Sequence, residues 1–412
     1  MQHKFGALDL IRAGLQDLDR ARTLFDELHN DGIDGDRMRL LLATLEKACD
    51  PDIALSNLVD IIKVMQSQGK DFTNIIADEN SFVRLITVLG VSDEMGKLMR
   101  FRPELVEAAA NDACESHLYN HEQRRAHVLK SVGADPNDHT MPTASLPLAE
   151  AATALRKTYR KQLAAIMAQD ATANDPIEIQ PRISTELSDL ADAALEGALA
   201  IARHEVDGSE HVRFAIIGMG KLGAQELNYV SDVDLIYVVE PADMDTNGMA
   251  LSRIGTKMAT TLQRVCQSVI MGVAEPTLWQ IDGGLRPEGK DGPLVRRLES
   301  HEAYYEQWAE NWEFQALLKA RPVAGDTDLG QAYMDMTRPF VWTASKRDNF
   351  VYDCQQMRKR VEDLIPNPLK DREIKLGRGG LRDVEFTVQM LQLVHGRSDE
   401  AVSYTHLRAH ET

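Results

Sequence analysis

Two aspartates separated by one residue, Asp232 and Asp234, are the first feature of the sequence that could do chemistry. Alternate residues of an extended strand point to the same face, so the two carboxylates can meet at one spot. Carboxylate oxygens suit Mg²⁺ or Mn²⁺, whereas two carboxylates held close without a cation repel each other. On its own, the pair is either part of a metal site or an acidic turn that caps a helix.

A third acid, Asp282, stands at the end of a candidate strand over residues 277–281 and before two glycines. If that strand lies beside the strand of Asp234, three carboxylates converge. Such a set can hold two cations, which clamp phosphate oxygens and stabilise the entering and leaving oxygens of phosphoryl transfer. The three acids therefore predict a catalytic metal site for a phosphorylated substrate.

A glycine-rich turn follows a candidate strand over residues 212–217, with glycines at Gly218, Gly220 and Gly223. The GxGxxG spacing, with Glu240 further on, matches a dinucleotide fingerprint. However, a parallel crossover requires a helix of several turns, and only ten residues separate Gly223 from Asp234. We expect instead that the turn offers backbone N–H groups to phosphate oxygens.

Cationic side chains near these motifs are candidate phosphate ligands: Lys221, Arg286, Lys290 and Arg297. A single exposed cation is more often surface solvation than function, so the prediction depends on their combination with the acids. A further basic run, Arg156, Lys157, Arg160 and Lys161, is typical of a solvated helix face.

The elements that must position these residues are mostly helices, so we expect a mainly α protein. One α/β domain, a small mixed sheet flanked by helices, lies between helical regions. The expected domains are an N-terminal helical region (1–130), a linker (131–145), a helical region (146–205), the catalytic domain (206–328) and a C-terminal helical region (329–402). Ser92 before Asp93 and Glu94 predicts a helix start.

Several individual elements are also expected within and after the catalytic domain. A second strand is expected over residues 234–239. Helices are expected over 249–270, 299–320, 329–342, 350–364 and 382–394.

The bulk composition excludes several classes of protein. A net charge of −18 over 412 residues argues against a nucleic-acid binder, and no stretch reaches the roughly 20 apolar residues of a membrane span. No signal peptide is expected, because residues 1–10 have no apolar core after Lys4. Its four cysteines, Cys49, Cys114, Cys266 and Cys354, form no metal-binding pattern and are expected to be packed as thiols. We therefore expect a cytoplasmic protein.

The last ten residues, 403–412, do not extend a helix or start another element. We expect them to be non-native and exclude His406 and His410 from the site. The sequence is expected to stop partway through a larger protein.

Together, the glycine-rich turn, the DxD pair and the third aspartate resemble the nucleotidyltransferase superfamily. Within it, four segments resemble the glutamine synthetase adenylyltransferases: GMGKLGAQELNYVSDVDLIY, DGGLRPEGKDGPLV, WAENWEFQALLKARPVAGD and IKLGRGGLRDVEF. The resemblance runs from about Leu85 to Gly396. Two small departures, Ala224 in place of a common glycine and Gly-Gly after Asp282, leave the acids in place.

That resemblance implies an enzyme of two similar halves. One attaches AMP from ATP to a tyrosine of glutamine synthetase, and the other removes it by phosphorolysis and releases ADP. The ELN before the DxD pair and the KLGxGGxRxxEF block at residues 375–386 favour the N-terminal, removing half. It also implies Mg²⁺ or Mn²⁺ and ATP or ADP as cofactors, and glutamine synthetase and the PII signal protein as partners.

The resemblance further implies a role for each residue of the site. Asp232, Asp234 and Asp282 would be the catalytic metal ligands. The nucleotide and its phosphates would contact Gly218, Gly220, Lys221 and Ser231, with Arg286 as a further candidate. At the start of the last helix, Arg382 and Glu385 either belong to a helix cap or face the active cleft. For Trp312, Glu313, Lys319 and Arg321 we favour a packing role.

Two alternatives stay open. The chain could transfer nucleotides to another acceptor, as PII uridylyltransferases or small-molecule adenylyltransferases do, although these are expected to lack the block at 375–386. It could also be a truncated fragment that binds glutamine synthetase or a PII protein without turnover.

Overall fold

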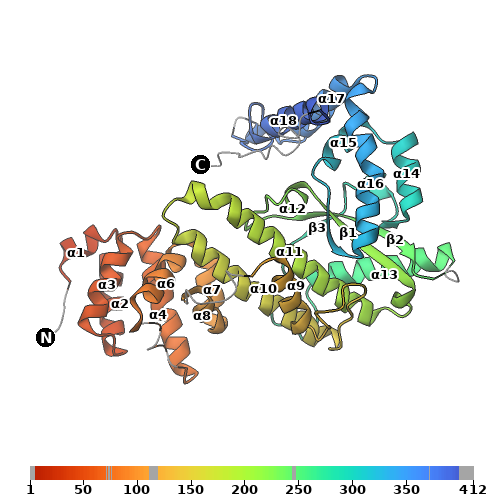
Figure 1. Ribbon diagram of the computed structural model, residues 1–412. Coiled ribbons are helices and arrows are strands. Elements are labelled where there is room, and N and C mark those ends of the chain that lie inside the picture. Colours follow the sequence, from red (N-terminus) through yellow and green to blue (C-terminus); the bar gives the residue numbers. More distant parts are fainter. Residues whose placement is uncertain are drawn as a thin grey trace. The chain divides into compact units, whose positions relative to one another are not determined.

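A computed structural model describes residues 5–70, 72, 75, 77–110, 119–243, 247–370 and 372–398. The chain forms two compact units. Unit 1 comprises Met1–Arg124 and Lys157–Glu186, and unit 2 comprises Arg125–Arg156 and Leu187–Thr412. Two long helices, α10 (Leu148–Ala171) and α11 (Pro176–Glu205), contribute residues to both units (Figure 1). The expected region 146–205 is thus divided between them, while the expected catalytic domain lies wholly in unit 2.

Unit 1 is built from helices around an apolar core. These are α1 (Ala7–Arg12), α2 (Leu18–Asn30), α3 (Gly35–Leu45), α4 (Pro51–Ser67), α6 (Glu79–Val91), α7 (Asp93–Phe101), α8 (Glu104–Ala110) and the start of α9 (His121–Ser131). Fully buried leucines such as Leu41, Leu55 and Leu85 form the core. The predicted helix start is confirmed, because the Ser92 side chain accepts a hydrogen bond from the Met95 amide at the start of α7.

Unit 2 contains a mixed sheet of five strands: β1 (Val212–Met219), β2 (Val233–Pro241), β3 (Ile281–Asp282), β4 (Val295–Arg296) and β5 (Arg321–Gly325). Four of them lie in the order β3-β2-β1-β5, and β4 also pairs with β2. β1 is antiparallel to β2 and to β5, whereas β2 is parallel to β3 and β4. The expected small mixed sheet is confirmed.

Helices cover both faces of this sheet (Figure 1). Ala215, Ile217 and other residues of one face share an apolar core with residues of α14 (Leu298–Gln307), α15 (Asn311–Leu317) and α16 (Thr327–Thr343). On the other face, α13 (Gly248–Gln267) packs so closely that a Cβ added at Gly255 would lie 3.0 Å from the Val239 side chain. Burial from both sides explains why β1 is almost continuously apolar.

The remaining elements of unit 2 are short or lie after the sheet. They are α12 (Gly220–Gly223), α17 (Phe350–Asp363), α18 (Leu381–His395), and the 3-10 helices η2 (Ser209–His211), η3 (Gly289–Asp291), η4 (Ala344–Lys346) and η5 (Asn367–Leu369). The expected helices over 249–270, 329–342, 350–364 and 382–394 are confirmed within a few residues at each end. The segment expected as a linker, 131–145, holds the last residue of α9 and no other helix or strand.

Two expected elements are wrong in detail. The single helix expected over 299–320 is two helices, α14 and α15, because Glu310 and Glu313 form a capping box that starts α15 afresh. The strand expected over 277–281 shrinks to Ile281 and Asp282. The short strands β4 and β5 were not predicted.

The basic run on α10 is a solvated face only in part, because Lys157 and Lys161 are exposed whereas Arg156 and Arg160 are buried. Arg156 is only 1% exposed, and its guanidinium donates to the carbonyls of Val265, Ser268 and Glu275. The last carbonyls of a helix have no partner within the helix, and the five donors of a guanidinium can satisfy several of them at once. Arg156 thereby holds the end of α13 and the start of the segment that leads to β3.

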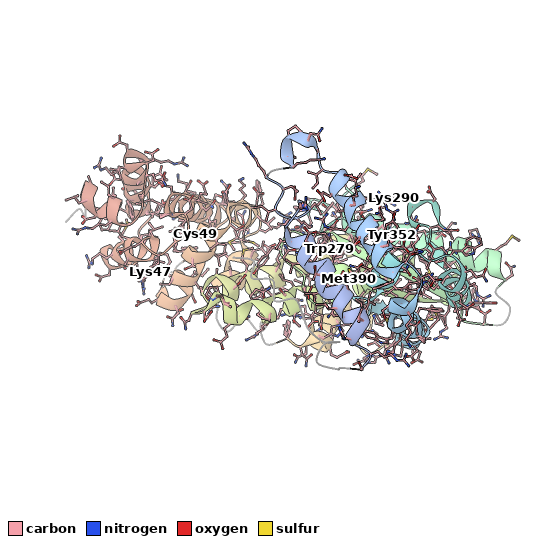
Figure 2. The ribbon with its side chains drawn as sticks, turned by 90° about the horizontal axis from the view of Figure 1, so that it is seen from above. Lys47, Cys49, Trp279, Lys290, Tyr352 and Met390 are labelled. Atoms are coloured by element: carbon pink, nitrogen blue, oxygen red, sulfur yellow. The ribbon has the colours of Figure 1, made fainter. Side chains whose placement is uncertain are left out.

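The cysteine prediction holds in part. Cys266 and Cys354 are buried free thiols, whereas Cys49 is exposed (Figure 2). Cys114 and the expected non-native tail 403–412, with His406 and His410, lie outside the described residues. Among the described helices, none combines the length and apolar character needed to cross a membrane.

Candidate active site

Strand pairing brings the predicted acids together. In the parallel pair of β2 and β3, Asp234 lies directly opposite Asp282. Asp232 precedes β2 by one residue, on the same side of the chain as Asp234 in an extended segment. The expectation that Asp282 lies beside the DxD pair is therefore confirmed.

The three acids create a strongly negative site. Burial, with the nearby charges of Asp232 and Asp282, raises the pKa of Asp234 to about 6, while Arg382 and Lys375 act in the opposite direction. Such a set of carboxylates fits a divalent cation, which would relieve the repulsion. The oxygens of the three acids do not all lie within 4.8 Å of one another. Asp282 Oδ1 accepts a 2.7 Å hydrogen bond from the Gly284 amide, which leaves Oδ2 available to a cation.

Gly220 places the backbone against these acids. It has a φ of +55°, and a Cβ there would lie 2.7 Å from Asp234 Oδ2. Only glycine meets both conditions without strain. Gly223 is packed even more closely, since its Cβ would lie 1.7 Å from the Lys319 carbonyl oxygen.

The same turn excludes a dinucleotide-binding crossover. The connection between β1 and β2 contains only the four-residue helix α12, and the two strands are antiparallel. A dinucleotide fold requires parallel strands joined by a longer helix. Glu240, the candidate ribose ligand of that fold, instead accepts a 2.9 Å hydrogen bond from Arg297.

A cavity of about 920 Å³ opens beside Asp232 and Asp234. It gathers residues from the glycine turn, the segment before β3, and helices α15, α17 and α18. Its lining includes Gly220, Lys221, Asn228, Tyr229, Val230, Ser231, Thr277, Leu278, Trp279, Gln280, Leu285, Trp312, Gln315, Ala316, Lys319, Met357, Val361, Lys375, Arg382, Glu385, Phe386 and Gln389.

Three of the seven predicted phosphate-binding residues reach this space, Gly220 among them. Lys221 and Ser231 line it, and the Ser231 hydroxyl donates to the Asp232 carbonyl over 2.8 Å. Gly218 lies inside β1, is buried and is not part of the lining.

Asp282 and Arg286 lie in a smaller adjoining pocket of about 300 Å³, together with Asp232 and Lys290 (Figure 2). The Arg286 guanidinium donates to the carbonyls of Gly283, Lys290 and Gly292. It therefore holds the loop that follows Asp282 and lies at the edge of the acidic site.

The residues at the start of α18 divide between the two roles expected from the sequence, a helix cap and a wall of the active cleft. Asp383 serves the helix start, because it accepts a 2.5 Å hydrogen bond from the Gly379 amide and pairs with Arg358. Arg382 and Glu385 line the cavity and form an ion pair of 3.0 Å with each other.

Lys319 links this helix to the glycine turn. Its ammonium lies 2.7 Å from Glu226 and 4.0 Å from Glu385. Of the residues for which packing was favoured, Lys319 and Trp312 in fact line the cavity. Glu313 is buried and accepts a hydrogen bond from Tyr304, so packing holds for that residue. The cavity residues that sequence reasoning missed include Trp279 (Figure 2), Gln315, Lys375 and Gln389.

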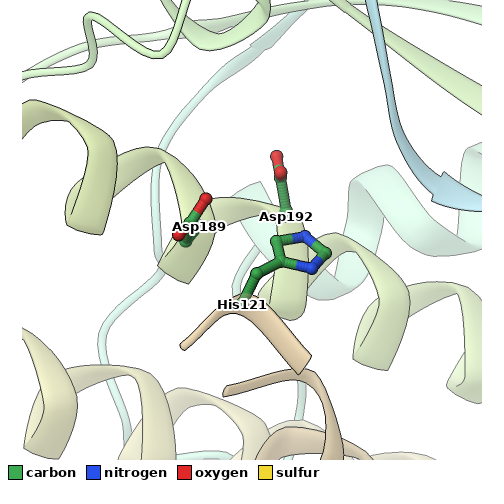
Figure 3. Close-up of side chains that lie close together, drawn as sticks. All are labelled: His121, Asp189 and Asp192. Carbon is green, nitrogen blue, oxygen red and sulfur yellow. The ribbon is translucent and has the colours of Figure 1, made fainter. Parts of the chain in front are cut away.

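A buried ion pair between Asp192 and Arg321 holds the glycine turn in place. Both oxygens of Asp192, on α11, contact the Arg321 guanidinium, at 2.6 and 3.1 Å. Arg321 also donates to the carbonyls of Leu222 and Gly223. Asp189 lies one turn earlier on α11 (Figure 3). It accepts a hydrogen bond from Gln225. His121, also labelled in Figure 3, belongs to unit 1.

The repulsion among the acids predicts how stability varies with pH. Because the pKa of Asp234 rises from 3.8 to about 6 on folding, the folded state binds the proton more tightly, and the free energy of unfolding falls as the pH rises between these values. Without divalent cations at pH 8, we expect Asp234→Asn to be more stable than the wild type by about 2 kcal/mol, after allowance for partial exposure.

Urea unfolding at pH 4 and pH 8 measures this difference. At pH 4 the wild type carries a protonated Asp234, and the two proteins should converge. Added Mg²⁺ should stabilise the wild type more than the variant at pH 8. A stability difference that is the same at both pH values would contradict the assignment of the repulsion to Asp234.

The fold and the site, a mixed sheet with a glycine turn and three acids beside a cavity, are those of a nucleotidyltransferase. The comparisons with known proteins agree with this class. Residues 82–336 match the family model for glutamate-ammonia ligase adenylyltransferase. The chain belongs to this family of enzymes.

Relatives are named bifunctional glutamine synthetase adenylyltransferase/adenylyl-removing enzyme. The Bifidobacterium longum relative is 76% identical over 97% of this chain, and that of Cutibacterium acnes is 43% identical over 96%. The Streptomyces avermitilis relative is 41% identical over 95% of this chain. These alignments span only 37%, 39% and 37% of the respective relatives, so the chain covers little more than a third of their length.

A second model, for GlnD PII-uridylyltransferase, matches residues 355–411. That range contains the block at 375–386. The presence of the block therefore does not by itself argue against the PII uridylyltransferases.

Proposed function

We propose that this chain is a metal-dependent nucleotidyltransferase that removes AMP from adenylylated glutamine synthetase by phosphorolysis, giving ADP. The observation that carries the proposal is the pairing of Asp234 with Asp282, next to Asp232, at one end of a cavity with cationic side chains. The names of the relatives supply the substrate. The cavity is also of the size that small-molecule and cofactor sites usually have.

In this reaction an oxygen of inorganic phosphate attacks the phosphorus of the adenylyl group. The bond from that phosphorus to the tyrosine oxygen breaks, and the oxygen leaves to regain a proton. A divalent cation held by Asp232, Asp234 and Asp282 would neutralise charge on the phosphate oxygens. Most of the rate enhancement then comes from positioning and charge neutralisation, without a covalent intermediate on the protein.

The chain's own groups take distinct parts in this scheme. The glycine turn at Gly220 brings backbone amides close to the reacting phosphate. Lys221, Lys375 and Arg382 supply positive charge on the cavity wall. Arg286 shapes the loop after Asp282, which is the role its three carbonyl contacts support.

The sequence also supports proposals on the half of the enzyme that this chain represents, on its regulator and on its location. We assign the chain to the adenylyl-removing, N-terminal half, because it carries ELN before the DxD pair. The PII signal protein is the proposed regulator. A cytoplasmic location is part of the same proposal, in keeping with the free thiols of Cys266 and Cys354.

One alternative has a specific observation in its favour. The match of residues 355–411 to the PII-uridylyltransferase model supports transfer of a nucleotide to a PII protein, with the same acids at the reacting phosphate. An adenylyltransferase acting on a small molecule, and a fragment that binds glutamine synthetase or a PII protein without turnover, are the further alternatives.

A set of parallel assays tests the proposal. The chain is incubated with adenylylated glutamine synthetase, inorganic phosphate and Mg²⁺, and we expect ADP to form only when phosphate is present. AMP transfer from ATP to unmodified glutamine synthetase, and UMP transfer from UTP to a PII protein, are measured beside it. If a folded chain releases no ADP but transfers UMP, the alternative replaces the proposal.

A further inference from the structure

Two glutamine side chains meet across the cavity wall from facing helices. Gln315 of α15 donates a 2.8 Å hydrogen bond from its Nε2 to Oε1 of Gln389 on α18. Both side chains line the large cavity, and both residues are buried, with 2% and 8% exposure.

Two polar groups of this pair, Gln315 Oε1 and Gln389 Nε2, take no part in the hydrogen bond between the side chains. Gln315 Oε1 is buried and accepts no hydrogen bond in the part of the chain that the structure describes. Gln389 Nε2 likewise donates to no other described residue. Buried polar atoms are nearly always paired, and an unpaired acceptor is costly. A donor on a bound molecule would remove that cost.

The surroundings of the pair fit a flat, mostly apolar group. Trp312 lies on α15 and Phe386 on α18, and both side chains line the cavity. Met357 and Val361 of α17 also line it. Aromatic and aliphatic walls with one acceptor and one donor at the edge are what an aromatic base needs from a binding site.

The position of the pair relative to the acids also fits a nucleotide. Lys319 lies four residues after Gln315, and Glu385 lies four residues before Gln389. Glu385 and Gln389 both lie on α18, where four residues are about one helical turn, roughly 5.4 Å. The Gln389 amide therefore lies about one turn beyond the Lys319–Glu385 contact. A ribose can span the distance between a phosphate near Arg382 and a base at the amides.

We propose that Gln315 and Gln389 recognise the base of the nucleotide. The Gln315 carbonyl oxygen accepts a hydrogen bond from the 6-amino group of adenine, and the Gln389 amide donates to an adjoining ring nitrogen. A glutamine amide offers the acceptor and donor that adenine requires, and here the two groups come from two side chains. The inference rests on the proposed function, because that function places an adenylyl group in this cavity.

The test compares ADP with purine riboside 5′-diphosphate, which lacks only the 6-amino group. Calorimetry with Mg²⁺ measures the binding of each nucleotide to the full chain. We expect the wild type to bind ADP about 10-fold more tightly than the analogue. Gln315→Met should weaken ADP binding to the level of the analogue and leave binding of the analogue unchanged.

Two further variants secure the result. Gln331→Met changes an exposed glutamine of α16 that pairs with Asp335, and it should leave the preference for ADP intact. The double variant Gln315→Met/Gln389→Met removes both partners, so that no amide is left unpaired, and should fold. It should show the same loss of preference.

The outcomes separate this inference from the proposed function, because binding requires no turnover. A wild type that binds both nucleotides equally, or binds neither, overturns the inference, as does a Gln315→Met variant that keeps the preference. If ADP release is observed without a preference for the 6-amino group, only the inference fails. If binding depends on the 6-amino group and ADP release is absent, only the proposed function fails.

Discussion

Replacing both Asp232 and Asp234 by asparagine is expected to lower phosphate-dependent ADP release at least about 1,000-fold. Asparagine keeps the shape of each side chain but removes the charge that would hold a divalent cation. The site would then lack the charge neutralisation on which phosphoryl transfer mainly depends. The measurement is the initial rate of ADP formation from adenylylated glutamine synthetase with inorganic phosphate and Mg²⁺.

A matched control is available on α16. Asp335→Asn makes the same chemical change at an exposed position whose partner is Gln331, and it should leave the rate unchanged. Circular dichroism establishes that the double variant is folded. A folded double variant that keeps more than about a tenth of the wild-type rate would remove these two acids from the mechanism.

Replacing Arg321 by methionine is expected to destabilise unit 2 by about 3–5 kcal/mol. The Asp192 side chain is fully buried and the Arg321 side chain only 25% exposed. Removing the guanidinium leaves a buried carboxylate without this cation, and it frees the carbonyls of Leu222 and Gly223. The midpoint of urea unfolding, followed by circular dichroism, measures the loss.

Arg297→Met provides the comparison for a surface pair. Arg297 is 47% exposed and contacts Glu240 at the end of β2, so its removal should cost less than about 1 kcal/mol. Equal losses for the two arginine variants would show that burial of the Asp192–Arg321 pair has no special weight. Loss of ADP release in a stable Arg321→Met protein would instead assign the pair a role in shaping the glycine turn.

The sequence was most informative where the site is local. Gly220 and the DxD pair lie within 15 residues of one another, so the turn and strand that hold them could be predicted from spacing alone. The adjacency of Asp282 was also predictable, because a short strand ending in an acid has few places in a small sheet. The length of the strand of Asp282 could not be predicted. The segment after α13 is held by Arg156 of α10, which lies more than 100 residues earlier in the sequence.

Long-range contacts account for what was missed. Nothing near Gln315 or Gln389 indicates that α15 and α18 face each other, since 74 residues separate the two side chains. The one available signal was the spacing of Trp312, Gln315 and Lys319, which would place them on one face of the helix expected over 299–320. The burial of Arg156 likewise depends on carbonyls more than 100 residues away.

The assembly of the cavity from distant segments has a consequence for how the protein is made. A ribosome adds about 5–20 residues per second, so Arg382 and Lys375 emerge roughly 7–30 seconds after Asp234. During that interval the nascent chain already has its sheet acids but lacks α18 and the cations beside it. Under the proposed function, the nucleotide site is therefore complete only late in synthesis, when the segment from Lys375 to Gln389 has been made.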